Sequence, residues 1–200
     1  MDKLLILGAG GFGRMVKETA QLLGYEDVVF LDDAAKNSDV IGKCCDYAAK
    51  HEEYKVAVAA FGNNNTRLFW TDKLLEAGFE VPAIVHPSAV VSPSAVLEAG
   101  CFVMQRAVVN TNSRIGRASL INSGAVVDHD SVIGYGALVG LGAIVKSNCT
   151  IQPKKRVEAG EVIFSTRRKI EGVDSRALED ALYAFGFGPQ CSYVKPFGEG

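Results

Sequence analysis

The sequence predicts an α/β + β protein: a small Rossmann-like βαβ domain, then a parallel β-helix and a short C-terminal helix. Two observations support this prediction. Near the N-terminus, short aliphatic runs alternate with helical patterns and glycine-rich or polar turns. From Val85 onward, an aliphatic residue recurs at every sixth position. We therefore expect three parts, a nucleotide-binding domain in residues 1–82, the β-helix in 83–165 and a C-terminal cap in 166–200.

The composition limits the classes of protein to consider. The chain has 200 residues, of which 48% are hydrophobic, and its formal net charge is −2. Such a composition excludes wholesale disorder, and the charge argues against general binding to nucleic acid or anionic membranes. No apolar run reaches the ~20 residues of a membrane span, and no signal-peptide pattern is found. The five cysteines form no CxxC pair, so we expect a reduced, cytoplasmic setting.

A glycine-rich segment follows the aliphatic run 4–7. Gly8, Gly10 and Gly13 fit G-x-G-x-x-G between a predicted strand and a predicted helix that ends at Gly24. Such a turn lets the backbone and a helix N-terminus approach an anion closely. The segment therefore predicts a nucleotide or phosphate site. The alternative is a turn that needs glycine for its backbone conformation only.

Two polar clusters follow the next predicted strands, 28–31 and 56–61. Asp32 and Asp33 close the first strand, and Gly62 with Asn63 follows the second. Ligands bind at the carboxyl ends of parallel strands, and Asp32 lies near the place where dinucleotide folds carry a ribose-binding acid. The alternative for the aspartates is to end the strand and cap the segment after it. Since residues 1–82 provide half of a dinucleotide fold, a mononucleotide or nucleotide-sugar is favoured over NAD.

The six-residue repeat has two columns. Fourteen successive positions from Val85 to Ile163 are aliphatic, and the positions four residues later are all small from Ala89 to Cys149. A triangular parallel β-helix explains this period, with one hexad on each face and between four and five coils. Lys155 and Glu161 break the small column, so we expect an irregular last coil that acts as a cap.

The segment after the repeat carries weaker signals. Asp174 and Ser175 are typical of a helix N-terminus and predict a short helix to about Tyr183. The basic run 167–169 is interpreted as a solvated surface segment, with phosphate binding as the alternative.

Three histidines are present. His51 lies in a polar stretch and is expected at the surface, and His86 is expected in the turn that leads into the β-helix. His129 stands between Asp128 and Asp130, outside both inward columns, so it should lie at a corner or on an outer face. A neighbouring carboxylate can orient the ring and raise its basicity, which suits a general base. A zinc site of three histidines is not expected.

These segments together resemble the bacterial sugar acetyltransferases that modify sialic acids and UDP-4-amino-sugars. The segments that carry the resemblance are GAGGFG at 8–13, FLDD at 30–33, GNN at 62–64 with Arg67, HPSA at 86–89, NSGAVVDHD at 122–130 and VIG at 132–134. In order and spacing they extend over residues 3–145. The sequence departs from the family after Cys149, where only irregular hexads follow in place of several further regular ones and a closing G-x-P-A segment is absent.

The resemblance implies a left-handed β-helix and a homotrimer, with acetyl-CoA between adjacent β-helices and no metal. His129 would be the catalytic base, and Asp130 the carboxylate that increases its basicity. The substrate contacts would be Gly10, Gly11, Phe12, Gly13, Asp32, Asp33, Gly62 and Asn63. The acetyl-CoA side would include Leu138, Gly140 and Gly142, and Leu138 stands where some members carry a second histidine.

The resemblance thus predicts direct transfer of an acetyl group from acetyl-CoA to a UDP-4-amino-sugar or a sialic-acid-type sugar. A non-catalytic nucleotide-sugar-binding or scaffold protein is the alternative, because the last coils depart from the family. A nicotinamide oxidoreductase would rest on the G-x-G-x-x-G pattern alone.

Overall fold

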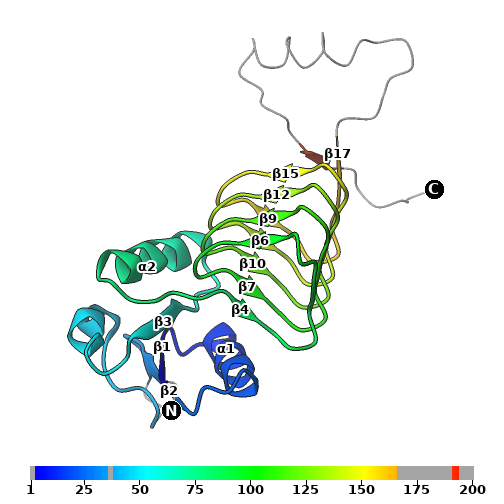
Figure 1. Cartoon of the computed structure of the whole chain (residues 1–200). Coiled ribbons are helices and arrows are strands. Elements are labelled where there is room, and N and C mark those ends of the chain that lie inside the picture. The colour runs from blue at the N-terminus through cyan, green and yellow to red at the C-terminus, as the bar shows by residue number, and fades with distance from the viewer. Residues whose placement is uncertain (1–2, 36–37, 166–190, 194–200) are drawn as a thin grey trace, which may run out of the picture.

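The N-terminal part is a three-layered α/β unit. The computed structural model describes residues 3–35, 38–165 and 191–193 (Figure 1). The first elements are β1 (Lys3–Leu7), α1 (Gly11–Leu22), β2 (Asp27–Leu31), the 3-10 helix η1 (Cys44–Lys50), β3 (Val56–Ala59) and α2 (Asn64–Glu76). The strands form a parallel sheet in the order β2-β1-β3. This arrangement confirms the predicted alternation of strands and helices.

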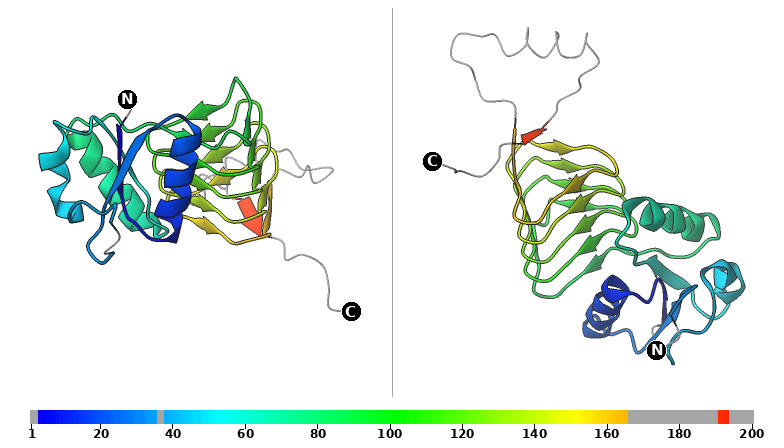
Figure 2. Two further views of the ribbon diagram at one scale, coloured as in Figure 1. Left: turned by 90° about the horizontal axis from the view of Figure 1, so that it is seen from below. Right: turned by 180° about the vertical axis from the view of Figure 1, so that it is seen from behind.

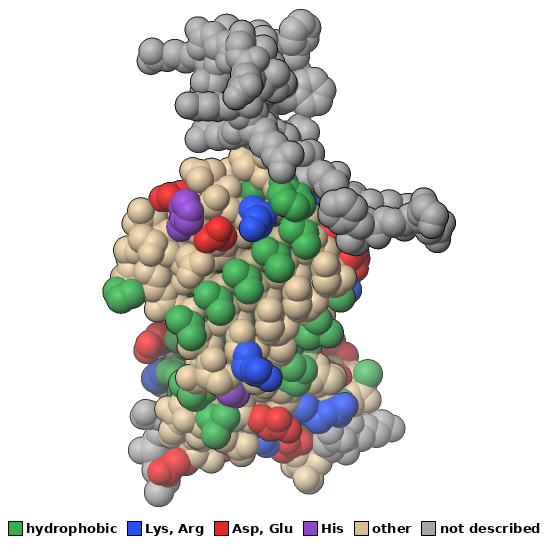
Figure 3. Space-filling view, turned by 90° about the vertical axis from the view of Figure 1, so that its right-hand side faces the viewer, with side chains coloured by type: hydrophobic (Ala, Val, Ile, Leu, Met, Phe, Trp, Pro, Cys, Tyr) green, Lys and Arg blue, Asp and Glu red, His purple; other side chains and the backbone are tan. Residues whose placement is uncertain are grey.

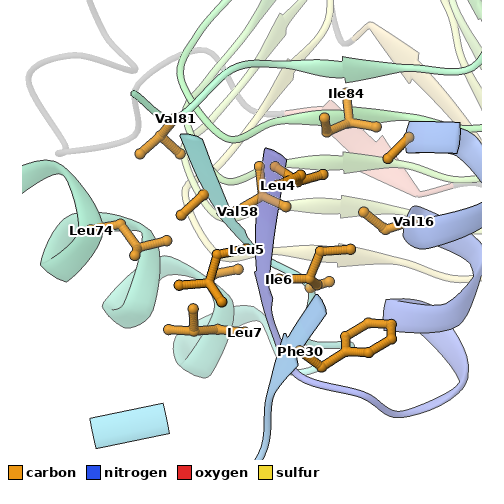
Figure 4. Packing of buried hydrophobic residues seen from close by; sticks show 14 of the residues in the cluster. Leu4, Leu5, Ile6, Leu7, Val16, Phe30, Val58, Leu74, Val81 and Ile84 are labelled. Carbon is orange, nitrogen blue, oxygen red and sulfur yellow. The ribbon is translucent and has the colours of Figure 1, made fainter. Parts of the chain in front are cut away.

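The core of this unit explains why β1 is a continuous apolar run. Leu5 and Leu7 point toward α2, and Ile6 lies on the other side of the strand with Val16 of α1 (Figure 4). All four residues of the run 4–7 are fully buried. A strand that is covered on both faces needs apolar side chains at every position rather than at alternate ones.

The second part is a parallel β-helix with fourteen short strands among the described residues. They are β4 (Ile84–Val85), β5 (Val90–Val91), β6 (Val96–Leu97), β7 (Phe102–Val103), β8 (Val108–Val109), β9 (Arg114–Ile115), β10 (Leu120–Ile121), β11 (Val126–Val127), β12 (Val132–Ile133), β13 (Leu138–Val139), β14 (Ile144–Val145), β15 (Thr150–Ile151), β16 (Arg156–Val157) and β17 (Val162–Ser165). Every third strand pairs in parallel, so the coils stack into three sheets.

We name the sheets by their strands. The first face contains β4, β7, β10, β13 and β16, the second β5, β8, β11, β14 and β17, and the third β6, β9, β12 and β15. The strand β18 (Cys191–Tyr193) adds to the second face, antiparallel to β17. The aliphatic column fills the interior as predicted, since its members from Val103 to Ile163 are all buried.

The corners of the coils use a left-handed backbone. The residue just before each member of the small column has positive φ at every corner from 100 to 160. Six of these residues carry side chains, namely Arg106, Asn112, Ala118, Asp130, Asn148 and Lys154. The left-handed conformation is uncommon outside glycine, although asparagine and aspartate adopt it most readily. The small residue that follows each of these corners is buried from Cys101 to Cys149.

The expected irregularity of the last coil is not observed. Strands β16 and β17 continue the register of the earlier coils, with Leu138 opposite Arg156 and Ile144 opposite Val162. Lys155 is exposed and Glu161 half-buried. Among the described residues no further coil follows them, so no later coil has to pack against the large polar side chains of Lys155 and Glu161.

The N-terminal unit covers the first face of the β-helix. Outward side chains of that face, from Ile84 through Phe102 and Leu120 to Leu138, belong to the same apolar core as β1. Figures 1 and 2 show the unit beside the coils near β4. The boundary between 82 and 83 stays a prediction.

Two further predictions concern the ends and the surroundings of the chain. The predicted C-terminal helix and the basic run 167–169 lie outside the described residues. Within the described ranges, no helix is long and apolar enough to cross a membrane. The cytoplasmic setting stays a prediction.

Candidate active site

His129 lies at the corner between the second and third faces, between β11 and β12. The following residue, Asp130, turns the chain with a φ of 57°. The Asp130 N–H donates to the carbonyl of Thr111 in the coil before (2.9 Å), and the Asn148 N–H donates to the carbonyl of His129 from the coil after (3.1 Å). Both neighbouring coils therefore fix the backbone that carries the imidazole.

The imidazole and a carboxylate form a close pair. His129 Nδ1 lies 2.7 Å from Asp130 Oδ2, and both side chains are about half exposed. A carboxylate can only accept, so the proton of the neutral ring is assigned to Nδ1. Nε2 is then an acceptor, and it has no partner within the described part of the chain. An imidazole in this tautomer can take a proton from a substrate.

Each carboxylate beside His129 is also bound by an amide of the preceding coil. Asp128 Oδ1 accepts from the His129 backbone N–H (2.9 Å) and from Asn110 Nδ2 (3.0 Å). Asp130 Oδ1 accepts from Asn112 Nδ2 (3.1 Å). Sequence reasoning missed both asparagines. The length of a coil could have identified them, because each asparagine stands 18 residues before the aspartate that it binds.

The electrostatics of the pair favour a charged Asp130 and a basic His129. The hydrogen bond to Asp130 raises the pKa of His129 above its ordinary value, and the charges of Asp128 and Asp130 add to this rise. In return, the hydrogen bonds from His129 and then Asn112 lower the pKa of Asp130. A carboxylate that stays ionised can stabilise the imidazolium formed when the ring accepts a proton.

The other two histidines have structural partners. His51 Nε2 lies 3.2 Å from the carbonyl oxygen of Gly78, and its ring packs edge-on against Phe79. His86 Nδ1 accepts from the Ser88 backbone N–H at 3.0 Å in the turn between β4 and β5, so it lies within the first coil rather than in a turn before the β-helix. Across the described ranges, no cluster of three or more histidine, cysteine, aspartate or glutamate side chains could hold a metal ion.

The glycine turn exposes the N-terminus of α1. Gly10 is the N-cap, Gly11 begins the helix, and a Cβ atom at either position would meet nothing within 4 Å. Gly13 has the opposite reason to be glycine, because its Cβ would lie 1.9 Å from the carbonyl oxygen of Gly8. Gly13 thus lets the helix pack on the turn, while Gly10 and Gly11 leave the helix end open to an anion.

Asp32 holds the glycine turn rather than facing an open site. Its Oδ2 accepts from the Ala9 N–H (2.7 Å), and its Oδ1 accepts from the N–H groups of Ala34 and Ala35 (2.8 Å each). Burial would raise the pKa of Asp32, but these three donors lower it on balance. Asp33 accepts from the Cys44 N–H at 3.0 Å through one oxygen. The structure therefore favours the capping interpretation for Asp32.

The remaining predicted substrate residues are also of two kinds, some with an open surface and some with a structural partner. A Cβ at Gly62 would meet nothing within 4 Å, so its surface is open. Asn63 caps α2 by accepting from the Thr66 N–H at 3.0 Å. The ring of Phe12 packs against Phe102 of the first face, with 5.1 Å between centroids.

The three residues predicted on the acetyl-CoA side lie in different surroundings. Leu138 is 4% exposed and packs in the core that joins the N-terminal unit to the first face. A Cβ at Gly140 would lie 2.7 Å from the carbonyl oxygen of Val157, so this glycine serves coil stacking. Gly142 is exposed at a corner, with open space around it. Burial therefore gives Leu138 a packing role that the prediction did not include.

One chain does not bring the two halves of the predicted site together. The glycine turn and Gly62 follow the carboxyl ends of β1 and β3, in the unit that covers the first face. His129 lies at the corner between the second and third faces, which is the corner opposite the first face in a triangular coil.

Arg67 is a second residue whose role the sequence did not show. It is fully buried on α2 and donates to the carbonyl oxygens of Phe61 (2.8 Å) and Ala118 (2.7 Å). Its spacing to Thr71 and Leu74, which are also buried, places it on the inward face of the helix.

The comparisons with known proteins agree with this architecture. Residues 3–74 match the family described as the PglD N-terminal domain. The solved structure of PerB from Caulobacter crescentus, in complex with CoA and GDP-perosamine, is 31% identical to this chain. The match covers 82% of this chain and 89% of PerB, with a TM-score of 0.70. The chain belongs to the sugar N-acetyltransferase family.

Two further members extend the comparison. A variant of perosamine N-acetyltransferase from Caulobacter crescentus, also in complex with CoA and GDP-perosamine, is 30% identical over 82% of this chain and 89% of that one, with a TM-score of 0.70. The acetyltransferase domain of PglB from Neisseria gonorrhoeae, in complex with acetyl coenzyme A, is 29% identical over 80% and 95%, with a TM-score of 0.52. By family this chain is an acyltransferase with a left-handed β-helix.

Proposed function

We propose that this family member transfers an acetyl group from acetyl-CoA to the amine of a nucleotide-linked amino sugar, with His129 as general base. The observation that carries the proposal is the His129–Asp130 pair, a basic imidazole with an unbonded Nε2 on a family scaffold. A UDP-4-amino-sugar is the acceptor that the sequence predicts. GDP-linked sugars, which two relatives bind, and sialic-acid-type sugars are the other acceptors to test.

The proposed reaction needs one proton acceptor and no acyl-enzyme. The amine nitrogen attacks the thioester carbonyl carbon while His129 Nε2 takes the proton from that nitrogen. The tetrahedral intermediate then collapses, the C–S bond breaks, and the CoA thiolate leaves and takes the proton from the imidazolium. Asp130 stays ionised throughout and stabilises the imidazolium. Holding both substrates in one cleft supplies a large part of the acceleration.

The sugar nucleotide would bind to the N-terminal unit, residues 1–82. We place its diphosphate at Gly10 and Gly11, where the bare end of α1 offers N–H groups and the positive end of the helix dipole. Asp33 and Gly62 follow the carboxyl ends of β2 and β3, at the same edge of the sheet, and would contact the rest of the nucleotide sugar. Phe12, Gly13, Asp32 and Asn63 would shape this site through their packing and capping.

The opposed positions of the glycine turn and His129 support association of the chains, and the family resemblance predicts that the assembly is a homotrimer. A sugar held by the N-terminal unit of one chain can reach the His129 of a neighbouring chain only if the chains associate. The second face, which adjoins the His129 corner, offers a surface for this association. Figure 3 shows a row of hydrophobic side chains over this side of the β-helix. The outward residues of the second face are Val90, Val108, Val126, Ile144 and Val162.

Acetyl-CoA would then lie in the cleft between adjacent β-helices, beside His129. Gly142 is the predicted contact whose surface is open, and Gly140 would act by keeping the coils close. No metal is needed in this mechanism, since the carboxylate and the imidazole supply the acid–base chemistry.

The decisive experiment measures release of the CoA thiol. We would incubate the purified full chain with acetyl-CoA and a panel of UDP- and GDP-linked 4-amino-sugars and sialic acids, and compare it with His129→Ala. Thiol release with one acceptor, lost in the variant while its melting temperature is kept, is the expected result. Retained turnover in the variant would refute His129 as the base.

The same panel tests the non-catalytic alternative, which the buried Leu138 and the departure after Cys149 favour. No thiol release with any acceptor, together with nucleotide-sugar binding in calorimetry, would establish a binding protein instead.

A further inference from the structure

The side chain of Asn112 belongs to the hydrogen-bond network around His129, although Asn112 is not one of the predicted substrate contacts. We propose that Asn112 is a positioning residue, which holds Asp130 in the orientation that makes His129 a base. The catalytic meaning of this inference rests on the proposed function. Its structural content, a three-residue relay from Asn112 through Asp130 to His129, can be tested without a substrate.

The relay follows from the stacking of two corners. Asn112 and Asp130 are 18 residues apart and take the same left-handed conformation, with φ of 59° and 57°. This similarity places one side chain over the other on successive coils. Asn112 Nδ2 donates to Asp130 Oδ1 at 3.1 Å, and Asp130 Oδ2 bonds His129 Nδ1 at 2.7 Å. Each carboxylate oxygen thus has its own partner, and the plane of the carboxylate is defined.

Asn112 is itself held from below. Its backbone N–H donates to Ser94 Oγ at 3.1 Å, and Ser94 is the corner residue of the coil before. The side chain of Asp130 is about half exposed, so without a partner at Oδ1 it would exchange between the ring and water. An amide donor at Oδ1, on a backbone that Ser94 holds in place, removes part of this freedom and favours the ionised carboxylate.

The neighbouring amide provides a contrast. Asn110 Nδ2 binds Asp128 Oδ1, the same oxygen that accepts the backbone N–H of His129. Asp128 therefore caps the peptide of His129 and bonds no atom of the ring. Asn110 therefore supports the backbone of His129. Of the two asparagines, only Asn112 binds the carboxylate that holds the imidazole.

The charges around His129 come from two coils. Its own coil supplies Asp128 and Asp130, which both raise the pKa of the imidazole. Lys146 of the following coil acts on Asp128 and lowers its pKa. The preceding coil supplies the neutral groups of Asn110, Thr111 and Asn112 at this corner. Removing the Asn112 side chain therefore changes the relay without changing any charge.

The test is an NMR titration of histidine rings labelled with 13C and 15N in the full-length protein. The sequence has three histidines, so the loss of one signal in His129→Gln assigns His129. Asn112→Gly removes the amide and keeps a residue that favours the left-handed backbone. Asn148→Gly is the matched control, because Asn148 has φ 58° at the same corner one coil later.

We expect Asn112→Gly to move the His129 titration midpoint to lower pH and to increase the fraction of rings protonated at Nε2. Asn148→Gly should change neither, and the two variants should melt at similar temperatures. In the unmutated protein, the side-chain N–H signals of Asn112 should titrate together with His129. The inference would be overturned if the His129 midpoint were unchanged in Asn112→Gly, or if the Asn112 signals did not shift as His129 titrates.

Kinetics separate this inference from the proposed function. If the protein releases thiol from acetyl-CoA, Asn112→Gly should lower kcat about tenfold with KM nearly unchanged, as expected for weakened base catalysis. If the protein shows no turnover, the proposed function fails, and the NMR titration still decides whether the relay exists.

Discussion

Arg67 and Ala118 are joined by a hydrogen bond of 2.7 Å between the guanidinium Nε and the carbonyl oxygen, which connects α2 to a corner of the β-helix. Arg67 Nη2 also lies 3.2 Å from the carbonyl oxygens of Gly136 and Ala137, one coil later. Burial lowers the pKa of Arg67 to about 10. The guanidinium therefore satisfies carbonyls of two coils, and it sets the N-terminal unit on the first face.

Removing this side chain should destabilise the protein strongly. We expect Arg67→Met to lower the free energy of unfolding by about 3 kcal/mol, because several buried carbonyls lose their donor. Arg117→Met is the control, since Arg117 forms a partly exposed ion pair with Asp72 at 2.8 Å, which should contribute less than about 1 kcal/mol. Denaturant unfolding of both variants measures the difference. Equal losses of unfolding free energy in the two variants would show that the buried network stabilises the protein no more than the exposed ion pair does.

The proposed catalytic pair of His129 and Asp130 predicts a pH dependence with a definite direction. His129 has a raised pKa and must be neutral to act as a base, so kcat/KM should increase with pH through a midpoint above the ordinary ~6.5. Asp130→Asn removes the main cause of the rise, so the midpoint should move to lower pH. The amide can also bond the wrong tautomer, and we expect kcat to fall about tenfold to a hundredfold.

The control for this profile is Asp128→Asn. Asp128 bonds the His129 backbone and acts on the ring through its charge alone. Its substitution should move the midpoint less than Asp130→Asn does. The thiol-release assay at a series of pH values gives both profiles, and an equal displacement in the two variants would contradict the assigned roles.

The repeat made the β-helix predictable from the sequence. A strict six-residue period fixes which side chains point inward, and the register follows from the stacking of coils of equal length. The glycine turn was predictable for a similar reason, because strand, glycines and helix are contiguous in the chain. The family resemblance then suggested the roles that we propose for His129 and Asp130, which local sequence patterns left open.

Contacts between distant segments were not predictable in this way. For Asp32 the sequence left both a ligand contact and a cap open, and it did not show the bond from the N–H group of Ala9, which joins the bonds from Ala34 and Ala35. Leu138 belongs to the repeat, but its burial depends on the N-terminal unit covering the first face. The bond from Ala9 to Asp32 depends on how the N-terminal unit folds, and the burial of Leu138 depends on how the two parts of the chain meet.

The row of aliphatic side chains on the second face predicts how the chains associate. Val90 is 62% exposed and Ile144 36% exposed, and an exposed apolar ladder of this kind is typical of an interaction surface. Ile144→Glu should place a charge in the proposed interface and convert the proposed trimer into smaller species in analytical ultracentrifugation. Leu22→Glu is the control, because Leu22 is 63% exposed on α1, away from this face. If Ile144→Glu sediments as the unmodified protein does, the second face is not the interface.

The opposed positions of the glycine turn and His129 predict that two inactive variants restore activity when mixed. His129→Ala removes the base and leaves the sugar-nucleotide site. Gly10→Asp blocks the diphosphate by charge repulsion, and it should keep the fold, because Gly10 is an N-cap with open space around it and aspartate is a favoured N-cap residue. In mixed assemblies, an intact glycine turn of one chain meets an intact His129 of its neighbour. Thiol release should therefore reappear after the two variants are unfolded and refolded together, and it should stay absent when each is refolded alone. Absence of activity in mixed assemblies, confirmed by mass spectrometry, would mean that each chain uses its own histidine.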